Sequence, residues 1–251
     1  MKRRLLPILM TLVLVCALPI WAAFVTSGDV TNPLVCTAGA TSPPDTAATR
    51  LKSAISNGGD VRLTEDIEIS ETLVVTRDVT LDLNGHVLKM TGDGSVLKVS
   101  DRATLTITDS RPQNPHTGPY GRLPAGGVIT GGKGPYVTGI YYVGGAVFLE
   151  KDTTLKLEGG TITGNSSRGS VFINGATFVM TGGTITGETV GVRNNVGTFT
   201  MTGGRITGCY EQGVYMSTGW MKMSEAAYIG GNNTRNTKED IFIEETLQTS
   251  A

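Results

Sequence analysis

Apolar and polar residues alternate in short bursts along most of this chain. The bursts begin near Val61 and recur every few residues, as at Leu81 and Leu83 and again at Leu105 and Ile107. Such alternation predicts half-buried strands, because successive side chains of a strand point to opposite faces. The pattern therefore predicts an all-β domain made of many short strands.

The segment before the strands has helical spacing instead. Apolar residues between Ala48 and Ile55 recur every three or four positions, the segment starts with Asp45, and it stops at the Gly58-Gly59 pair. An acidic residue at the start and glycine at the end are typical of helix termini. We expect one short amphipathic helix over 45–57 that caps the first strands and blocks pairing at their open edge.

A six-residue motif then repeats. The segment GGTITG occurs at 159–164 and 182–187, followed by GGRITG at 203–208, and an earlier relative, GGVITG, lies at 126–131. A repeat of fixed period lets neighbouring units bury one continuous core. The motif therefore indicates a repeat architecture.

The period of the repeat is about 22 residues. The units that begin at Thr154, Thr177, Thr198 and Trp220 are 23, 21 and 22 residues apart. Each unit holds three strand-like bursts, which predicts one triangular coil per unit, with the strands of successive coils stacked in parallel about 4.8 Å apart.

These repeats resemble a known family. The form T-F-x-M-T-G-G-x-I-T-G at 177–187 and 198–208, preceded by V-T-L-D-L-N-G-H at 79–86, is similar to the right-handed parallel β-helix of pectate-lyase-like proteins. The glycine- and threonine-rich versions on exported bacterial surface proteins are the most similar. The resemblance implies a right-handed parallel β-helix (β-solenoid) of about seven coils within residues 45–251, and it carries no catalytic residue with it.

Alternation also assigns the faces of each strand. One set of apolar residues should point inward and stack in columns of like side chains. From the first strand these are Leu81, Leu83, Leu105, Ile107, Leu155, Leu157, Phe178, Met180, Phe199, Met201, Met221 and Met223, from the second Ile129, Ile162, Ile185 and Ile206, and from the third Val147, Leu149, Val171, Ile173, Val192, Val214, Ile241 and Ile243. The glycine pairs are expected at corners.

The outward side of the first strand is rich in threonine. Thr80, Thr104, Thr154, Thr177 and Thr198 are expected to form one column. A regular threonine lattice is a candidate ice-binding face, although threonine is also simply a good exposed strand former.

The outward side of the third strand carries an aromatic stripe with one guanidinium. Its ligand-binding candidates are Phe148, Phe172, Arg193, Tyr215 and Phe242. Aromatic rings beside amides provide a platform for sugar faces. Cover by a loop or by the 24–44 segment, or packing against another protomer, would explain the same stripe.

Two insertions interrupt the period, at 109–125 and 131–145. Insertions on solenoids commonly form binding faces. These two carry the cations and phenols Arg111, His116, Tyr120, Arg122, Lys133, Tyr136, Tyr141 and Tyr142. They add the ligand-binding candidates His116 and Tyr120 and the weak catalytic candidates Arg122, Lys133 and Tyr136. A lyase that abstracts a proton needs such a base beside a neutralised carboxylate.

The rest of the composition restricts the chemistry. A net charge of −1 gives no field that attracts nucleic acid. The acidic residues do not form the clusters of a calcium site or of a glycoside hydrolase, and two histidines without metal-ligand spacing make a metal site unfavourable. We expect neither a metal nor a cofactor.

The amino-terminal part is expected to direct export. Basic residues at 2–4 precede an apolar run that ends near Ala22-Ala23, which predicts a signal peptide over 1–23, with an uncleaved membrane anchor as the alternative. Residues 24–44 are expected to be a flexible linker. Cys36 and Cys209 are left as a candidate pair.

Two functions from different classes follow. The first is a secreted or cell-surface, non-catalytic solenoid that contacts polysaccharides or surface glycoproteins through the stripe and the insertions, in the manner of an adhesin. The second is a carbohydrate-active enzyme, a polysaccharide lyase or a glycoside hydrolase, centred on the insertions. Self-association at the last rung, 220–245, is a further expectation, because an open parallel edge invites a partner. The alternative is that the charges of Glu239, Asp240, Glu244 and Glu245 protect this edge.

Overall fold

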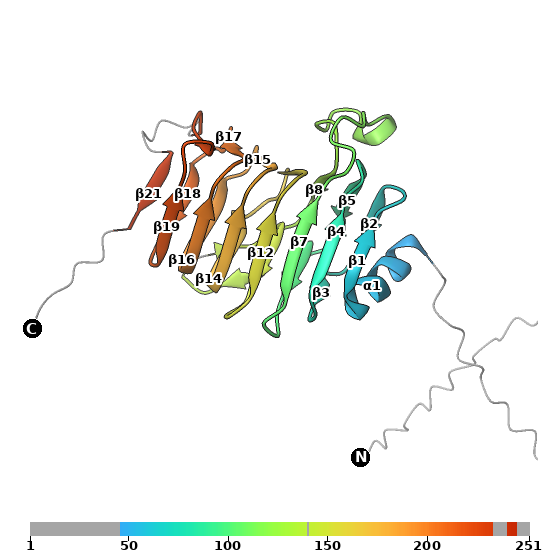
Figure 1. Cartoon of the computed structure of the whole chain (residues 1–251), viewed down its shortest axis with the longest axis horizontal. Helices are drawn as coiled ribbons and strands as arrows, with labels where there is room; N and C mark the ends of the chain where they lie inside the picture. Colours follow the sequence, from blue (N-terminus) through green and yellow to red (C-terminus); the bar gives the residue numbers. More distant parts are fainter. Residues whose placement is uncertain (1–45, 140, 233–239, 245–251) are drawn as a thin grey trace, which may run out of the picture. The chain divides into compact units, whose positions relative to one another are not determined.

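The computed structural model describes residues 46–139, 141–232 and 240–244. The expected signal peptide, the expected linker with Cys36, and Asp45 lie outside the described residues. The described chain forms an all-β parallel solenoid of about eight turns with one short helix at its beginning, compared with the expected count of about seven coils (Figure 1).

Three faces run along the solenoid. Face 1 contains β1 (Gly59–Arg62), β4 (Val79–Asp82), β7 (Thr104–Thr108), β12 (Thr154–Leu157), the second halves of β14 (Arg168–Met180) and β16 (Val190–Met201), and β19 (Trp220–Met223). Face 2 is a seven-stranded sheet of β2 (Ile67–Ile69), β5 (Val87–Met90), β8 (Val128–Thr130), β13 (Thr161–Thr163), β15 (Thr184–Thr186), β17 (Arg205–Thr207) and β20 (Tyr228–Ile229). Every strand pair within these faces is parallel.

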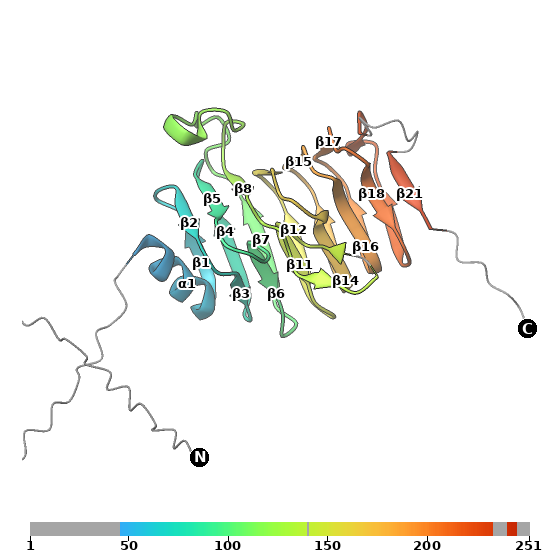
Figure 2. The same ribbon diagram turned by 180° about the vertical axis from the view of Figure 1, so that it is seen from behind.

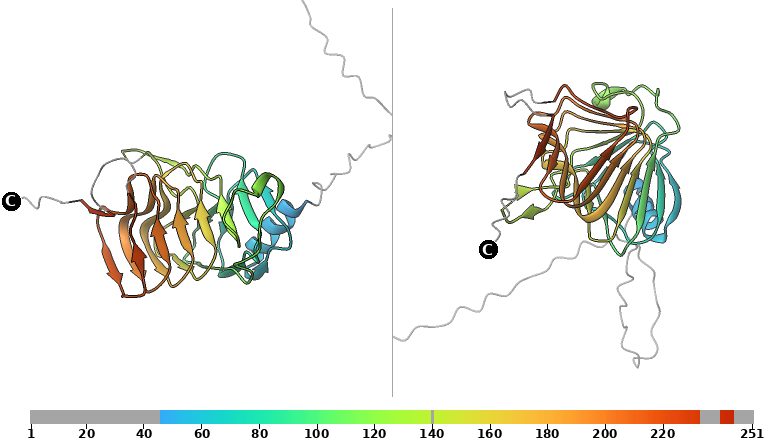
Figure 3. Two further views of the ribbon diagram at one scale, coloured as in Figure 1. Left: turned by 90° about the horizontal axis from the view of Figure 1, so that it is seen from above. Right: turned by 60° about the vertical axis from the view of Figure 1, so that its left-hand side comes forward.

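Face 3 comes into view in Figure 2, where the molecule is seen from behind. It contains β3 (Leu73–Val75), β6 (Leu97–Val99), β11 (Val147–Leu149), the first halves of β14 and β16, β18 (Gln212–Met216) and β21 (Ile241–Ile243). Figure 3 shows from above how the coils stack side by side along one axis.

The expected capping helix is present as α1 (Ala47–Asn57). Its N-cap is Thr46, whose hydroxyl accepts a hydrogen bond from the backbone N–H of Thr49. Leu51 and Ile55 are buried against the first coil, and each contributes about 1.5–3 kcal/mol through removal of its side chain from water. The helix thus closes the apolar interior at this end of the solenoid.

The inward columns form as alternation predicts. Leu157 pairs with Met180, and Met180 pairs with Met201, so each side chain packs on its counterpart in the next coil. All three are fully buried. At the last rung Met223 and Ile243 continue the inward columns, in register with Met201 and Met216, but they are 42% and 68% exposed. Among the described residues no further coil covers these two side chains.

The glycine pairs lie at corners, as expected. A Cβ atom on Gly182 would lie 2.2 Å from the carbonyl oxygen of Glu158 in the preceding coil, and Gly183 has a φ of +73°. Only glycine meets both demands without strain. The repeated motif therefore builds the turn from face 1 to face 2.

Candidate functional site

The two insertions leave the solenoid at opposite ends of β8 and do not form one site. The insertion 109–125, with the short 3-10 helix η1 (Gly118–Tyr120), projects between faces 1 and 2 and is the green loop in Figure 1. The insertion 131–145 leaves between faces 2 and 3 and forms the antiparallel hairpin β9 (Tyr136–Val137) and β10 (Tyr141–Tyr142).

His116 and Tyr120 hold the first insertion onto the solenoid. The Nε2 atom of His116 lies 2.7 Å from the carbonyl oxygen of Gly126, and the Tyr120 hydroxyl donates to Oε1 of Glu68 at 2.7 Å. Lys89 also binds this carboxylate, at 2.9 Å. Burial and the neighbouring Glu68 carboxylate raise the pKa of Tyr120 to about 12. These contacts give both residues a structural role, while Arg122 of the same insertion is exposed.

Lys133, a catalytic candidate, lies in the second insertion and is paired with an acid. Its Nζ atom is 2.7 Å from Oδ1 of Asp93. The hydrogen bond and the charge of Asp93 raise the pKa of Lys133 above its ordinary value. The amine is therefore protonated at neutral pH, which disfavours it as the base of a lyase.

The aromatic stripe on face 3 has the predicted register. Phe148 pairs with Phe172, Phe172 with Arg193, Arg193 with Tyr215, and Tyr215 with Phe242. The stripe is not open at Phe172, which is only 1% exposed, as the alternative of cover by a loop predicts.

The second insertion accounts for this burial. It runs across face 3, where β10 lies against β14 and the N–H of Gly144 donates to the carbonyl of Gly169 at 2.6 Å. The rings of Phe148 and Phe172 pack together beneath it, with centroids 5.2 Å apart. The stripe is thus divided into a part beneath the insertion, Phe148 and Phe172, and a half-buried part, Arg193, Tyr215 and Phe242. In the second part the guanidinium of Arg193 lies 4.0 Å from the centre of the Tyr215 ring.

A groove opens where the second insertion meets the corner between faces 2 and 3. It consists of two adjoining pockets, of ≈ 530 Å³ and ≈ 700 Å³, which share Tyr142 and Ser166 as lining residues. We call it the corner groove. Its lining residues are Asp93, Gly94, Lys133, Gly134, Pro135, Tyr136, Tyr142, Gly164, Asn165, Ser166, Ser167, Arg168, Gly187, Thr189 and Tyr210.

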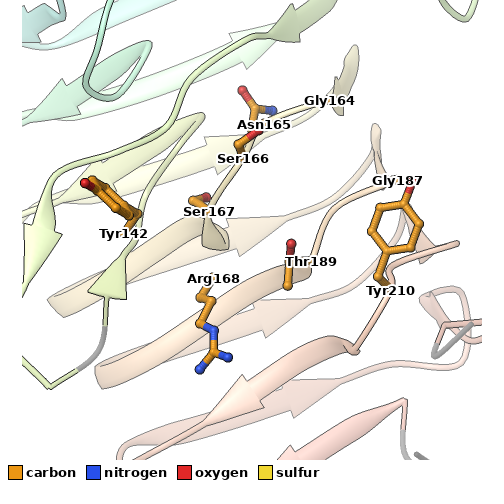
Figure 4. A pocket seen from close by; sticks show the side chains of 9 residues that line it. All are labelled: Tyr142, Gly164, Asn165, Ser166, Ser167, Arg168, Gly187, Thr189 and Tyr210. Atoms are coloured by element: carbon orange, nitrogen blue, oxygen red, sulfur yellow. The ribbon is translucent and has the colours of Figure 1, made fainter. Parts of the chain in front are cut away.

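Three tyrosines of the corner groove are exposed. Tyr136 is 58%, Tyr142 is 52% and Tyr210 is 49% exposed, and the rings of Tyr136 and Tyr142 meet edge to face with centroids 5.5 Å apart. Figure 4 shows Tyr142 and Tyr210 on opposite sides of one pocket, with Arg168 and Thr189 between them. The groove therefore combines aromatic surface with hydroxyl and guanidinium groups.

The sequence predicts only part of this groove. Lys133, Tyr136 and Tyr142 of the second insertion line it, whereas Arg193 and Tyr215 line a neighbouring pocket of ≈ 250 Å³ that shares Arg168. The missed signal is the segment directly after the ITG end of a repeat (TITG at 161–164 and 184–187, RITG at 205–208), which reads N-S-S-R at 165–168 and C-Y-E at 209–211. These residues interrupt the threonine-rich repeat at one corner.

A buried carboxyl lies behind the groove. Glu188 is fully buried, and its two oxygens accept hydrogen bonds from the backbone N–H and the side-chain amide of Asn165, at 3.1 and 2.9 Å. Burial raises the pKa of Glu188 to about 7, although the nearby Ser170 hydroxyl and Asn165 oppose this shift. Cys209 in the next coil is a free, buried thiol, and burial raises its pKa to about 12.

The threonine columns differ from the expected array. Thr80 pairs with Thr106 rather than Thr104, so it belongs to another column. Thr104, Thr154, Thr177 and Thr198 do form one column on face 1, which ends at Trp220. The threonine column is thus four rungs long, and a large ring ends it.

The described residues form neither a metal-binding cluster nor a membrane-spanning helix. Within 46–139, 141–232 and 240–244, no group of three or more His, Cys, Asp or Glu side chains is placed to hold a metal ion. No helix in these ranges is long and apolar enough to span a membrane.

The fold defines the class of the protein as a parallel β-solenoid. In comparisons with known proteins, no family model, no curated protein and no solved structure matches the chain.

Proposed function

We propose that the protein is an exported or cell-surface solenoid that binds glycans at the corner groove without catalysis. The observation that carries this proposal is the grouping of three half-exposed tyrosines around one groove. Exposed aromatic rings that gather at a concave surface are uncommon on solenoids that only support other domains, and they indicate a contact site.

The chemistry of the lining suits sugars. The C–H faces of a pyranose ring are apolar and pack on aromatic rings, while its hydroxyl groups require hydrogen-bonding partners at the edge. Tyr142 and Tyr210 offer the rings, and Ser166, Arg168 and Thr189 offer the polar groups. Export is supported by the basic and apolar composition of residues 1–23.

Lyase activity is a second candidate, because Lys133 and Tyr136 line the same pocket. The ion pair between Lys133 and Asp93 works against it, since a protonated amine cannot abstract a proton. Release of unsaturated sugars from uronate polymers, lost in Lys133→Ala, would favour the enzyme and contradict the non-catalytic proposal.

A glycan array with the purified full-length protein tests the proposal. We expect binding to a restricted set of glycans, and a loss of about tenfold in affinity for Tyr142→Ala and for Tyr210→Ala, which corresponds to about 1.4 kcal/mol for one stacked ring. Trp220→Ala is the matched control, because this ring is 80% exposed but lies on face 1. No glycan binding, or equal losses in all three variants, would overturn the proposal.

A further inference from the structure

A column of polar side chains runs through the corner beneath the groove. The residue after the last glycine of each repeat turn, which ends in ITG at 162–164, 185–187 and 206–208 and in IGG at 229–231, lies at this corner and in three of four coils accepts a hydrogen bond from the backbone of the preceding coil. Gly132 N–H donates to Oδ1 of Asn165 at 2.9 Å, Asn165 N–H donates to Glu188, and Cys209 N–H donates to Oδ1 of Asn232 at 3.0 Å. These bonds satisfy buried backbone groups that the turn removes from the sheets.

Glu188 differs from the other members of this column. The side chains of Asn165 and Asn232 are neutral. Burial raises the pKa of the Cys209 thiol to about 12, so this thiol is also neutral near pH 7. The carboxyl of Glu188 alone gains a charge near neutral pH, because its pKa is raised to about 7. A negative charge at this fully buried position is costly, since the surrounding protein solvates it less well than water does.

The same carboxyl is connected to both walls of the corner groove. Glu188 holds Asn165, which lines the first pocket, through two hydrogen bonds. Asn165 in turn holds Gly132, next to Lys133 of the second pocket. A second bond at this corner, from Gly145 N–H to Oγ of Ser167 at 3.1 Å, ties the other end of the insertion to the same segment.

We infer that Glu188 makes the corner groove pH-responsive: the neutral acid keeps the 164–168 segment and the 131–145 insertion joined, and ionisation of the buried carboxyl loosens them. The consequence for binding rests on the proposed function, because a glycan that needs both walls binds more weakly when they separate. The local opening itself does not depend on any ligand.

Other charged and titratable groups of the described residues lie near this corner, but none of them joins its two walls as Glu188 does. Arg168 lines the groove on the same segment. Asp240 lies one coil beyond Cys209, where its Oδ1 accepts from Asn232 N–H at 2.9 Å. His86 and His116 contact Asp66 and Gly126, on the far side of face 2.

Hydrogen exchange of the full-length protein between pH 5 and 8.5 tests this inference. After correction for intrinsic rates, the protection of the Asn165 and Gly132 amides should fall on the order of 100-fold as pH rises, because the closed state binds one proton more tightly than the open state. In Glu188→Gln, a neutral side chain of similar shape, protection should not depend on pH. Glu158→Gln, at an exposed site on face 1, should behave like the wild type.

Two outcomes would overturn the inference. One is constant protection of these amides in the wild-type protein, and the other is an unchanged pH response in Glu188→Gln. If the glutamine variant does not fold, a carbon-13 NMR titration of the Glu188 carboxyl in the wild-type protein takes the place of the variant experiment. A titration midpoint below about 5 would overturn the inference. Since exchange requires no glycan, a negative glycan array would leave this result intact and would overturn only the proposed function.

Discussion

The rings of Phe178 and Phe199 lie stacked in neighbouring coils, with centroids 4.9 Å apart and planes inclined by 10°. Both rings are fully buried, and the two residues pair in register between β14 and β16. The strand ladders fix the distance between coils, so the surroundings cannot collapse to fill the space of a missing ring. The stack therefore makes the interior of the solenoid sensitive to loss of volume.

We expect Phe199→Ala to lower the free energy of unfolding by about 3–5 kcal/mol, since it removes buried apolar surface and leaves a cavity. Chemical denaturation measures this change. Thr200→Ala, on the outward side of the same strand, is the control and should cost less than about 1 kcal/mol. Equal effects of the two substitutions would mean that β16 does not present Phe199 to the core.

Gly182 should be intolerant of any side chain. Its missing Cβ would lie 2.2 Å from the backbone oxygen of Glu158, which belongs to the neighbouring coil and cannot move independently. Gly182→Ala is expected to destabilise the protein by about 1–3 kcal/mol, as overpacking does in cores.

Gly121→Ala is the matched control for this glycine. It has a helical φ of −60°, and its added Cβ would lie 3.4 Å from the nearest atom. Thermal unfolding of both variants should therefore show a lower transition temperature for Gly182→Ala alone. If both variants unfold at the wild-type temperature, the coils are less tightly stacked at this corner than the structure indicates.

Tyr120→Phe should change the titration of Glu68. The Tyr120 hydroxyl is the main cause of the lowered pKa of this carboxyl, and Lys89 is the second. Without the hydroxyl the pKa of Glu68 should rise toward its ordinary value but stay below it, because Lys89 remains. An NMR titration of the carboxyl checks this, with Tyr228→Phe on the last coil as the control. An unchanged midpoint in Tyr120→Phe would show that the insertion is not anchored through this bond.

The architecture could be predicted from the sequence because alternation and repeat spacing depend on local geometry alone. Phe178 and Met180 are inward for the same reason that every second residue of a strand is. Phe172 was assigned to the outward side correctly, and cover by a loop was one of the open alternatives, but the sequence did not show which segment would cover it. The insertion 131–145 that covers it has no repeat of its own, so its path depends on contacts such as Gly144 with Gly169.

Most of the corner groove could not be predicted from the sequence for a related reason. Asn165 and Glu188 are 23 residues apart, and nothing in either position alone shows that one accepts hydrogen bonds from the other. The alignment of the ITG ends of the repeats places both directly after the final glycine, which brings them together in space only once the coils stack. Tyr142 and Tyr210 come to opposite sides of one pocket in the same way, from an insertion and from a corner three coils later.

The stability of the protein should fall between about pH 4.5 and 7 because of Glu188. Its pKa rises from 4.5 in the unfolded chain to about 7 in the folded protein, so the folded state binds more protons in this interval. The stabilisation is fully present below pH 4.5 and is lost as pH rises through 7, by about 3 kcal/mol in total. Urea unfolding at several pH values measures it, with Glu188→Gln as the reference. The difference between wild type and variant should change in this interval, whereas a constant difference would mean that the carboxyl is solvated in the folded protein.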